Sequence, residues 1–308
     1  MKNNLFPGPY EIPVGNSNAV SEIFYNEFDI TWHRENKLYN PTQRDWGLLA
    51  GEHAIDDGTV TYRYNNEYFR SDEFINEHHG LHILFAGCSE TEGQGGELDD
   101  SWGKILFDKV KSNHETDGFF NLGKAGYGWQ KIISQIRIYI NKYGKPDNLF
   151  VLLPNIGRSI EWSDADSDWY VKQSYPKIGE NKTLDSADNP LLSDLAPQEY
   201  KKLFIDFVIS WRLFEDFCDA ANIKLVWGTW EPIDDYNFSK SNLFNNFVPL
   251  PKNDLPQIID KYRKDAKITL RDLEKRDGHH GRLFHEYWAD TMLEESKRKN
   301  FIYDKKNN

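Results

Sequence analysis

A serine between two glycines follows an apolar run near residue 85. The run Ile83-Leu84-Phe85-Ala86 has the composition of a buried strand, and it leads directly into Gly87-Cys88-Ser89-Glu90-Thr91-Glu92-Gly93. In a parallel α/β sheet, ligands bind at the carboxyl ends of the strands, where side chains leave the core and meet solvent. A hydroxyl at that place can be reached by a substrate and by a base, so Ser89 is a candidate nucleophile.

Three segments further along the chain carry residues whose chemistry complements that of a serine. A serine hydroxyl is a poor nucleophile until a base removes its proton, and His280 can be that base because histidine titrates near neutral pH. Asp277, three residues earlier, can orient the imidazole and stabilise its charged form. The backbone N–H groups of Ser89 and Gly126, with the side-chain amide of Asn155, can point at a developing oxyanion.

The ordered set Ser89, Gly126, Asn155 and Asp277-x-x-His280 resembles the SGNH (GDSL-type) hydrolases, and the resemblance covers about residues 82–298. That family comprises esterases and acylhydrolases on a flavodoxin-like α/β/α sandwich. The resemblance implies a catalytic triad of Ser89, Asp277 and His280, an oxyanion hole formed by Ser89, Gly126 and Asn155, and no metal or other cofactor. Residues 64–74 are also similar to a segment that precedes the serine block in some bacterial and phage-encoded members.

Two blocks depart from the family pattern. The family's Gly-Asp-Ser is Gly-Cys-Ser here, which removes a carboxylate that stabilises the turn. Its Gly-x-Asn-Asp is Leu153-Pro154-Asn155-Ile156, which removes an aspartate beside the oxyanion asparagine. Neither change removes a residue with a direct catalytic role. The Gly-x-Ser-x-Gly elbow of another hydrolase fold is absent, because Thr91 occupies its last glycine position.

The pattern from residue 82 onward alternates between strands and helices. This alternation predicts an α/β fold, a three-layer α/β/α sandwich in which helices cover both faces of a parallel sheet, and the family resemblance makes that sheet flavodoxin-like. The expected helices have apolar residues at helical spacing, and Ser101 is a plausible N-cap for the first of them. The expected strands are 83–86, 119–122, 149–153 and 223–227, and the expected helices cover 102–110, 129–143, 200–217 and 284–292.

Two regions depart from this alternation. Residues 1–80 are rich in aromatic and polar side chains with weak periodicity, so we expect an irregular N-terminal extension packed on the main domain, which spans 81–308. One alternating run in the extension, Val60-Thr61-Tyr62-Arg63-Tyr64, suggests an edge strand or a hairpin arm. The polar segment 156–197 is long for a plain connection, so we expect a functional lid or a mobile insert there.

Each candidate site residue also has a purely structural interpretation that the sequence leaves open. Ser89 could cap a helix or form a turn, and Asn155 could be a turn residue after its strand. Gly126 could serve only a positive φ angle. Asp277 with Gly278 is a common turn signal and could cap the last helix.

Cysteine and metal chemistry are two further alternatives. Cys88 could be the nucleophile, but adjacent residues in an extended segment point to opposite sides, so Cys88 is better explained as a small buried residue. Histidines cluster twice, without the tight helical pair and nearby carboxylate of a metal site, so we expect exposed histidines in both clusters. The two clusters are His78, His79 and His82, and His279, His280 and His285.

Composition limits the classes of partner and compartment. The formal net charge of −12 argues against nucleic acid or an anionic membrane as the main partner. Two cysteines cannot build a disulfide framework, and no apolar stretch has the length of a signal peptide or a transmembrane segment. We therefore expect a product made in a cytoplasm, with later release or assembly into a larger particle left open.

These observations lead to a serine esterase as the expected function, with a small-molecule or glycan ester as its substrate. Trp227, Trp230 and Glu231 leave a strand end and are candidates to line the pocket. Because tryptophan faces suit sugar rings, removal of O-acetyl groups from a carbohydrate is the preferred reaction. The alternatives are a non-catalytic carbohydrate-binding or assembly module on the same fold, and acyl transfer to a sugar. The sequence does not decide the oligomeric state.

Overall fold

The computed structural model describes residues 38–39, 60–61, 63–163, 168–176, 192–195, 197–230, 238, 243–250 and 279–302. The helices and strands within these ranges are, in chain order, β1 Leu38–Tyr39, β2 Val60–Thr61, β3 Ile83–Gly87, α4 Ser89–Glu92, the short 3-10 helix η3 Leu98–Asp100, α5 Trp102–Lys111, β4 Phe120–Asn121, α6 Trp129–Tyr143, β5 Asn148–Leu153, β6 Arg158–Ser163, β7 Asp168–Pro176, β8 Leu192–Leu195, α7 Pro197–Ala220, β9 Lys224–Thr229 and α11 Arg282–Arg298.

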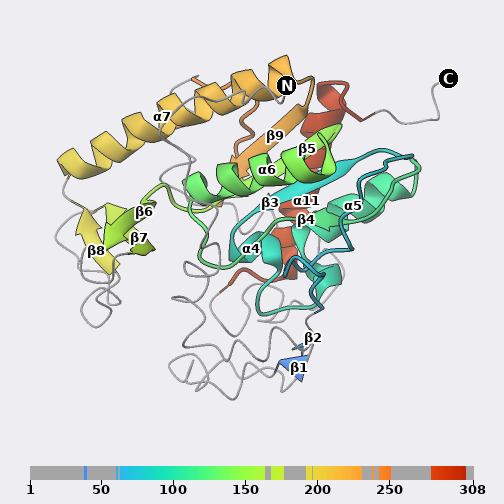
Figure 1. The fold of residues 1–308 in the computed structure, drawn as a ribbon, viewed down its shortest axis with the longest axis horizontal. Coiled ribbons are helices and arrows are strands. Elements are labelled where there is room, and N and C mark those ends of the chain that lie inside the picture. The colour runs from blue at the N-terminus through green and yellow to red at the C-terminus, as the bar shows by residue number, and fades with distance from the viewer. Residues whose placement is uncertain are drawn as a thin grey trace.

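The central element is a four-stranded sheet in which every strand is parallel to its neighbours (Figure 1). The strand order is β4-β3-β5-β9, which is second-first-third-fourth along the chain and matches the beginning of the flavodoxin-like order. All residues of β3 and β5 are buried. Strands covered on both faces need apolar side chains throughout, which explains their unbroken hydrophobic runs. The predicted α/β fold with a parallel sheet is confirmed.

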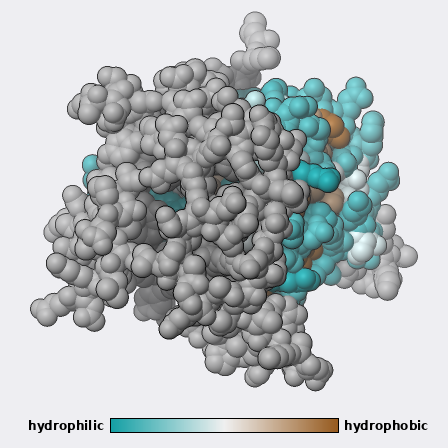
Figure 2. Space-filling view, turned by 90° about the horizontal axis from the view of Figure 1, so that it is seen from below, coloured by the Kyte–Doolittle hydropathy of each residue, from teal (hydrophilic) through white to brown (hydrophobic). Residues whose placement is uncertain are grey.

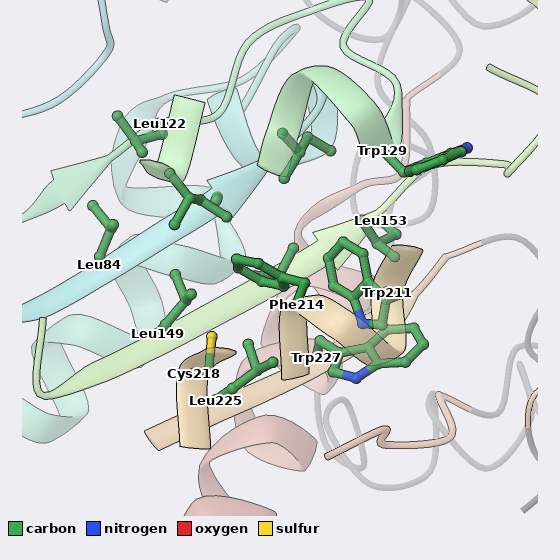
Figure 3. Packing of buried hydrophobic residues seen from close by; sticks show 14 of the residues in the cluster. Leu84, Leu122, Trp129, Leu149, Leu153, Trp211, Phe214, Cys218, Leu225 and Trp227 are labelled. Carbon is green, nitrogen blue, oxygen red and sulfur yellow. The ribbon is translucent and has the colours of Figure 1, made fainter. Parts of the chain in front are cut away.

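Two hydrophobic cores lie on opposite faces of this sheet. In β3, Leu84 belongs to the core under α6 and α7, and Phe85 to the core under α5 and α11. Figure 3 shows Trp211 and Phe214 of α7 packed over the strand residues of the first core. The opposite core contains Trp288 of α11. Helices therefore cover both faces of the sheet, as the three-layer prediction requires.

The helix boundaries follow local sequence signals. The side chain of Ser101 accepts a hydrogen bond from the backbone N–H of Lys104, which satisfies one free donor at the start of α5 and confirms the predicted N-cap. Helix α6 ends at Gly144, which has a φ of +96°, and a side chain there would be strained.

The segment 156–197 contains a small sheet, where the sequence analysis expected a lid or a mobile insert. Strands β6 and β7 pair antiparallel, and β8 pairs parallel to β7. These strands were not predicted from the sequence because the segment is dominated by polar and charged residues, so that short apolar groups such as Trp169-Tyr170-Val171 do not stand out.

The expected arm of the N-terminal extension begins in β2. Val60 pairs with Tyr39 and Thr61 with Leu38 in an antiparallel two-stranded ladder, and most other residues before 63 lie outside the described ranges. From residue 63 the chain packs on the main domain. The ring of Phe74 contacts that of Tyr139 on α6, with centroids 5.0 Å apart.

The expectation of exposed histidines was wrong for most of the two clusters. His82 is only 2% exposed, its ring stacks on His78 with centroids 3.6 Å apart, and its Nε2 lies 2.8 Å from the Tyr139 hydroxyl. His285 is fully buried, whereas His79 is exposed. Composition cannot show this burial, because His82 is covered by a segment whose packing the sequence pattern does not reveal.

Candidate active site

The candidate nucleophile opens a short helix at the carboxyl end of β3. The chain turns at Gly87, where an added Cβ would collide with the side chain of Thr91 and with the carbonyl oxygen of Leu152 on the neighbouring strand. Cys88 is the N-cap residue of α4, and Ser89 is its first residue. Glycine is therefore required at position 87 for α4 to fold back across the edge of the sheet.

All four side chains of α4 are buried, and that of Ser89 is 4% exposed. The Ser89 hydroxyl makes a long contact of 3.9 Å with Sγ of Cys88. No hydrogen bond joins this hydroxyl to the His280 ring in the described part of the chain. The serine thus lies at the predicted sheet edge, with its hydroxyl directed toward its own neighbour in the chain.

His280 is held by the residue that follows Ser89. Its Nδ1 lies 2.8 Å from Oε1 of Glu90, and its backbone N–H donates to the same oxygen at 3.2 Å. A carboxylate can only accept, so Nδ1 carries the proton and the other ring nitrogen keeps a lone pair when the imidazole is neutral. Asp277, the carboxylate expected from the sequence, lies outside the described residues.

His285 approaches the same carboxylate with its Nε2. Its Nδ1 accepts the backbone N–H of Trp102 at 3.1 Å, so the proton of the neutral ring is on Nε2. Nε2 lies 3.2 Å from the carbonyl oxygen of His280 and 3.4 Å from Oε2 of Glu90. The Glu90 contact is long and makes no well-aligned hydrogen bond, since Oε2 has no such partner in the described structure. His285 therefore supports Glu90 more weakly than His280 does.

These contacts keep Glu90 ionised although it is almost fully buried. Burial by itself raises the pKa of a carboxyl group, but the contacts from His280 and His285 outweigh it and hold the pKa of Glu90 well below its ordinary value. Glu90 is 3% exposed. An ionised carboxylate next to an imidazole can stabilise the positive charge that forms when the ring takes up a proton.

Three aromatic side chains contact the His280 ring. The rings of Phe284 and Trp288 lie 4.9 Å and 5.0 Å from it, and the ring of Trp230 lies at 6.0 Å. The indole N–H of Trp230 points to Sγ of Cys88 at 3.4 Å. Trp230 therefore contacts both Cys88, the residue before Ser89, and the His280 ring, and it remains a candidate to line a pocket.

The prediction that Trp227 lines the pocket was wrong. This side chain is fully buried under α7, and its indole N–H donates to the buried carboxylate of Glu215 at 2.8 Å. Side chains alternate along a strand, and position 227 points into the core. Glu231, the third candidate in this segment, lies outside the described residues.

The predicted oxyanion donors lie at the same sheet edge as Ser89. Asn155 is buried two residues after β5, and its Oδ1 accepts the N–H of Gly157 at 2.6 Å. Because Oδ1 is bound to Gly157, the Nδ2 donor of the same amide points away from the backbone of residues 155–157. Gly126 has a φ of +79°, a left-handed conformation that favours glycine.

The loop that carries Gly126 is fastened to α4. The N–H of Ala125 donates to Oε2 of Glu92 at 2.7 Å. A Cβ on Gly123 would collide with the backbone of Thr91 and Glu92, so the loop and the helix touch through main-chain atoms. Helix α4 and the Gly126 loop thus form one packed unit.

The segment before β3 closes this unit from the other side. The Tyr64 hydroxyl donates to Oε1 of Glu92 at 3.1 Å. Arg70 is buried and donates to the carbonyl oxygens of Gly93 at 2.7 Å and of Gly96 at 3.0 Å, just after α4. The sequence analysis noticed this segment only through its similarity to some family members and assigned no role to Arg70 or Glu92.

The described residues contain no group of three or more histidine, cysteine, aspartate or glutamate side chains placed to hold a metal ion. Both nitrogens of His285 already have partners, which leaves it without a free lone pair for a metal. The arrangement is suited to proton transfer and to stabilisation of charge.

Comparison of the chain with protein-family models and with curated proteins found no match. Among the described residues, no helix has the length and apolar character needed to cross a bilayer. The geometry around α4 is thus the observation from which a function can be argued.

Proposed function

We propose that this protein is a serine hydrolase that cleaves a carboxylic ester through an acyl-enzyme on Ser89. The observation that carries the proposal is the 2.8 Å contact between Nδ1 of His280 and the carboxylate of Glu90. This contact brings an imidazole to the residue next to the candidate nucleophile. It also fixes the tautomer in which Nε2 can accept a proton, as a general base requires.

The first half of the reaction forms the acyl-enzyme. The Ser89 oxygen attacks the carbonyl carbon of the ester while Nε2 of His280 takes the serine proton. The carbonyl oxygen becomes an oxyanion, which the N–H groups of Ser89 and Gly126 and the Nδ2 of Asn155 stabilise. The C–O bond to the alcohol then breaks, and the alcohol leaves with the proton from His280.

The second half releases the acid. Water attacks the acyl carbon while His280 takes a proton from it, the bond to Ser89 breaks, and the serine oxygen recovers its proton. No cofactor takes part. The reaction requires the Ser89 hydroxyl to rotate away from Cys88 and toward His280 when substrate binds. A serine side chain has three staggered positions for such a rotation, and catalytic hydrogen bonds often tighten only in the substrate complex.

The substrate we propose is an ester on a small molecule or a glycan, with an O-acetylated sugar preferred. Trp230 and Phe284 flank the His280 ring and offer flat apolar faces to a sugar ring. The net charge of −12 disfavours polyanionic substrates such as nucleic acid. Transfer of the acyl group to a second sugar would use the same residues.

A non-catalytic binding module is the second candidate function. The observation that favours it is the orientation of the Ser89 hydroxyl, which contacts Cys88 and not His280. A carbohydrate-binding or assembly module would keep the packed α4 unit and the aromatic side chains without needing a reactive serine.

A fluorophosphonate probe separates the two functions, because it phosphonylates an activated serine and leaves an ordinary one unmodified. We expect the intact protein to gain one probe mass, located at Ser89 by peptide mapping, and to hydrolyse p-nitrophenyl acetate. Ser89→Ala should abolish labelling and lower turnover on the order of 10⁶-fold or to background. Cys88→Ala is the matched control and should retain labelling. Absence of labelling together with absence of turnover on short-chain esters would favour the binding module.

A further inference from the structure

The outward face of α7 carries a row of exposed apolar side chains. Five large hydrophobic side chains are exposed among the described residues, and three of them lie on this helix: Ile205 at 47%, Ile209 at 55% and Leu213 at 53%. These three are four residues apart, so they form one continuous ridge along the helix surface. By contrast, the described surface in Figure 2 is mainly hydrophilic, with scattered apolar residues. Such a ridge on a peripheral helix (Figure 1) indicates contact with another molecule.

Charged residues border this ridge in a symmetric pattern. Lys202 and Asp216 lie seven positions before and seven positions after Ile209, and Asp206 and Arg212 lie three positions before and three after it. Each pair combines one positive and one negative charge. Lys202, Asp206 and Asp216 are exposed, and Arg212 is half-buried. The pattern is therefore self-complementary when the helix is reversed about Ile209.

We infer that α7 forms the interface of a homodimer, in which the two copies of the helix pack antiparallel about a two-fold axis at Ile209. A two-fold interface brings each residue opposite the one at the same distance on the other side of the axis. Ile205 then packs on Leu213 of the second copy, and Lys202 faces Asp216 of that copy. Arg212 is held within its own helix, where it donates to Glu215 at 2.9 Å and to Asp216 at 3.4 Å. Every favourable contact occurs twice.

The charge pattern identifies a second copy of this chain as the occupant of the ridge. Antiparallel pairing in this register brings Lys202 opposite Asp216 of the other copy twice, once on each side of the axis. One helix face is small compared with the roughly 1,200–2,000 Å² of a standard stable interface, so the dimer forms reversibly, with a dissociation constant of about micromolar or weaker. No residue of the candidate active site lies on α7, so this inference is independent of the proposed function.

Sedimentation velocity at protein concentrations from about 1 μM to about 1 mM tests the dimer. We expect the sedimentation coefficient to rise with concentration from that of a monomer to that of a dimer. Ile209→Lys places two like charges at the axis and should raise the dissociation constant at least about 100-fold. The matched control is Leu243→Lys, which changes an exposed leucine outside α7 and off the ridge and should leave the dimer unchanged. A monomer at every concentration, or a dimer that survives Ile209→Lys, would overturn the inference.

Charge reversal tests the pairing itself. Lys202→Glu puts a glutamate opposite Asp216 of the second copy in two places and should raise the dissociation constant about tenfold. Adding Asp216→Lys to the same chain restores opposite charges and should recover most of the affinity. If the double variant binds no better than Lys202→Glu alone, the proposed register is wrong.

Cysteine cross-linking gives an independent check of the register. The two native cysteines are buried and do not compete for surface oxidation. Ile209→Cys should form a disulfide with its own copy across the axis, whereas Ile205→Cys alone should not. An equal mixture of Ile205→Cys and Leu213→Cys chains should cross-link. Efficient self-linking at position 205 would contradict the antiparallel arrangement.

Discussion

At the scale of single residues, the carboxylate that orients the candidate base follows the candidate nucleophile directly in the chain. Glu90 and His280 are 190 residues apart and meet at 2.8 Å. In most serine hydrolases the carboxylate, the base and the nucleophile come from three separate segments. Here Ser89 and Glu90 belong to one turn of helix, so any movement of α4 displaces the nucleophile and the orienting carboxylate together.

Replacing Glu90 by glutamine tests this role. Glutamine has nearly the same shape as glutamate but is neutral. Its side chain can also turn its NH₂ group toward Nδ1 of His280, and this group has no lone pair to accept the Nδ1–H proton. We expect kcat to fall on the order of 10²- to 10⁴-fold, because the imidazolium loses its counter-charge and the ring can adopt the wrong tautomer. The measurement is steady-state hydrolysis of p-nitrophenyl acetate, with thermal unfolding recorded beside it.

Glu92→Gln is the matched control for this prediction, because Glu92 is equally buried on the same helix but contacts Ala125 and Tyr64 and not the histidine. The glutamine oxygen can still accept the Ala125 N–H and keep the Gly126 loop in place, so the variant should lower the unfolding temperature with a much smaller effect on kcat. If Asp277→Asn abolishes turnover while Glu90→Gln leaves kcat unchanged, Asp277 is the orienting carboxylate and the role given to Glu90 is wrong.

At the scale of elements, α4 and the loop 121–126 act as one unit because their main chains touch. Gly123→Ala tests this contact, since the added methyl group would meet backbone atoms of Thr91 and Glu92 that have no freedom to move. We expect a loss of about 1–3 kcal/mol in the free energy of unfolding, together with a loss of esterase turnover as the Gly126 loop moves away from Ser89. Urea denaturation and ester hydrolysis measure the two effects.

Ala125→Gly changes the same loop without adding an atom, and it should cost about 1 kcal/mol or less. If Gly123→Ala unfolds at the same urea concentration as the wild type and retains full turnover, then the close packing of loop and helix does not position the site.

An element could be predicted from sequence where its own residues form a clear apolar run or a clear helical period. β3, β5 and β9 each contain an unbroken run of apolar residues, and α6 and α7 carry regular helical stripes, so their positions could be predicted from sequence. β6, β7 and β8 could not, because polar and charged residues dominate the segment 156–197 in which they lie. α4 was expected as a turn, because four residues give too little periodicity to identify a helix.

The candidate site was predictable in part for the same physical reason. An apolar strand precedes each of Ser89, Asn155 and Gly126. Because the strands are parallel, these three residues could be predicted to lie at the same edge of the sheet. The role of Glu90 could not be predicted, because nothing near it in sequence shows that it is buried or that His280 contacts it. Trp227 was misassigned, since a strand-end tryptophan suits a pocket as well as a core in the sequence alone.

At the scale of the whole molecule, the buried residue His82 makes the free energy of unfolding depend on pH. Burial, with the charge of nearby His78 as a second cause, lowers the pKa of His82 to about 4, against an ordinary value of about 6.5. Asp147, which accepts the backbone N–H of His82, and Asp117, which holds His78, act in the opposite direction and only partly offset this effect. His82 is therefore neutral in the folded protein at neutral pH and well below it.

This shift predicts a loss of stability in mild acid. Between about pH 6.5 and pH 4 the unfolded chain binds a proton at position 82 that the folded chain does not, so the free energy of unfolding falls as the pH falls through this window. Above about pH 6.5 the free energy of unfolding carries no penalty from His82. By about pH 4 it has fallen by about 3 kcal/mol, because each unit of pKa shift corresponds to about 1.4 kcal/mol. Urea denaturation at about pH 7.5 and about pH 4.5 measures the loss.

His82→Phe isolates this contribution from that of the carboxylates. Phenylalanine keeps an aromatic ring against His78 but does not titrate, so the variant should lose less stability on acidification than the wild type, by about 2–3 kcal/mol. It should also be less stable than the wild type at neutral pH, because the Tyr139 hydroxyl loses its partner. His79→Gln removes an exposed histidine and should leave the acid-induced loss unchanged. If the wild type and His82→Phe lose equal stability, then His82 has the same pKa in the folded and unfolded chains. Other groups would then cause the acid sensitivity.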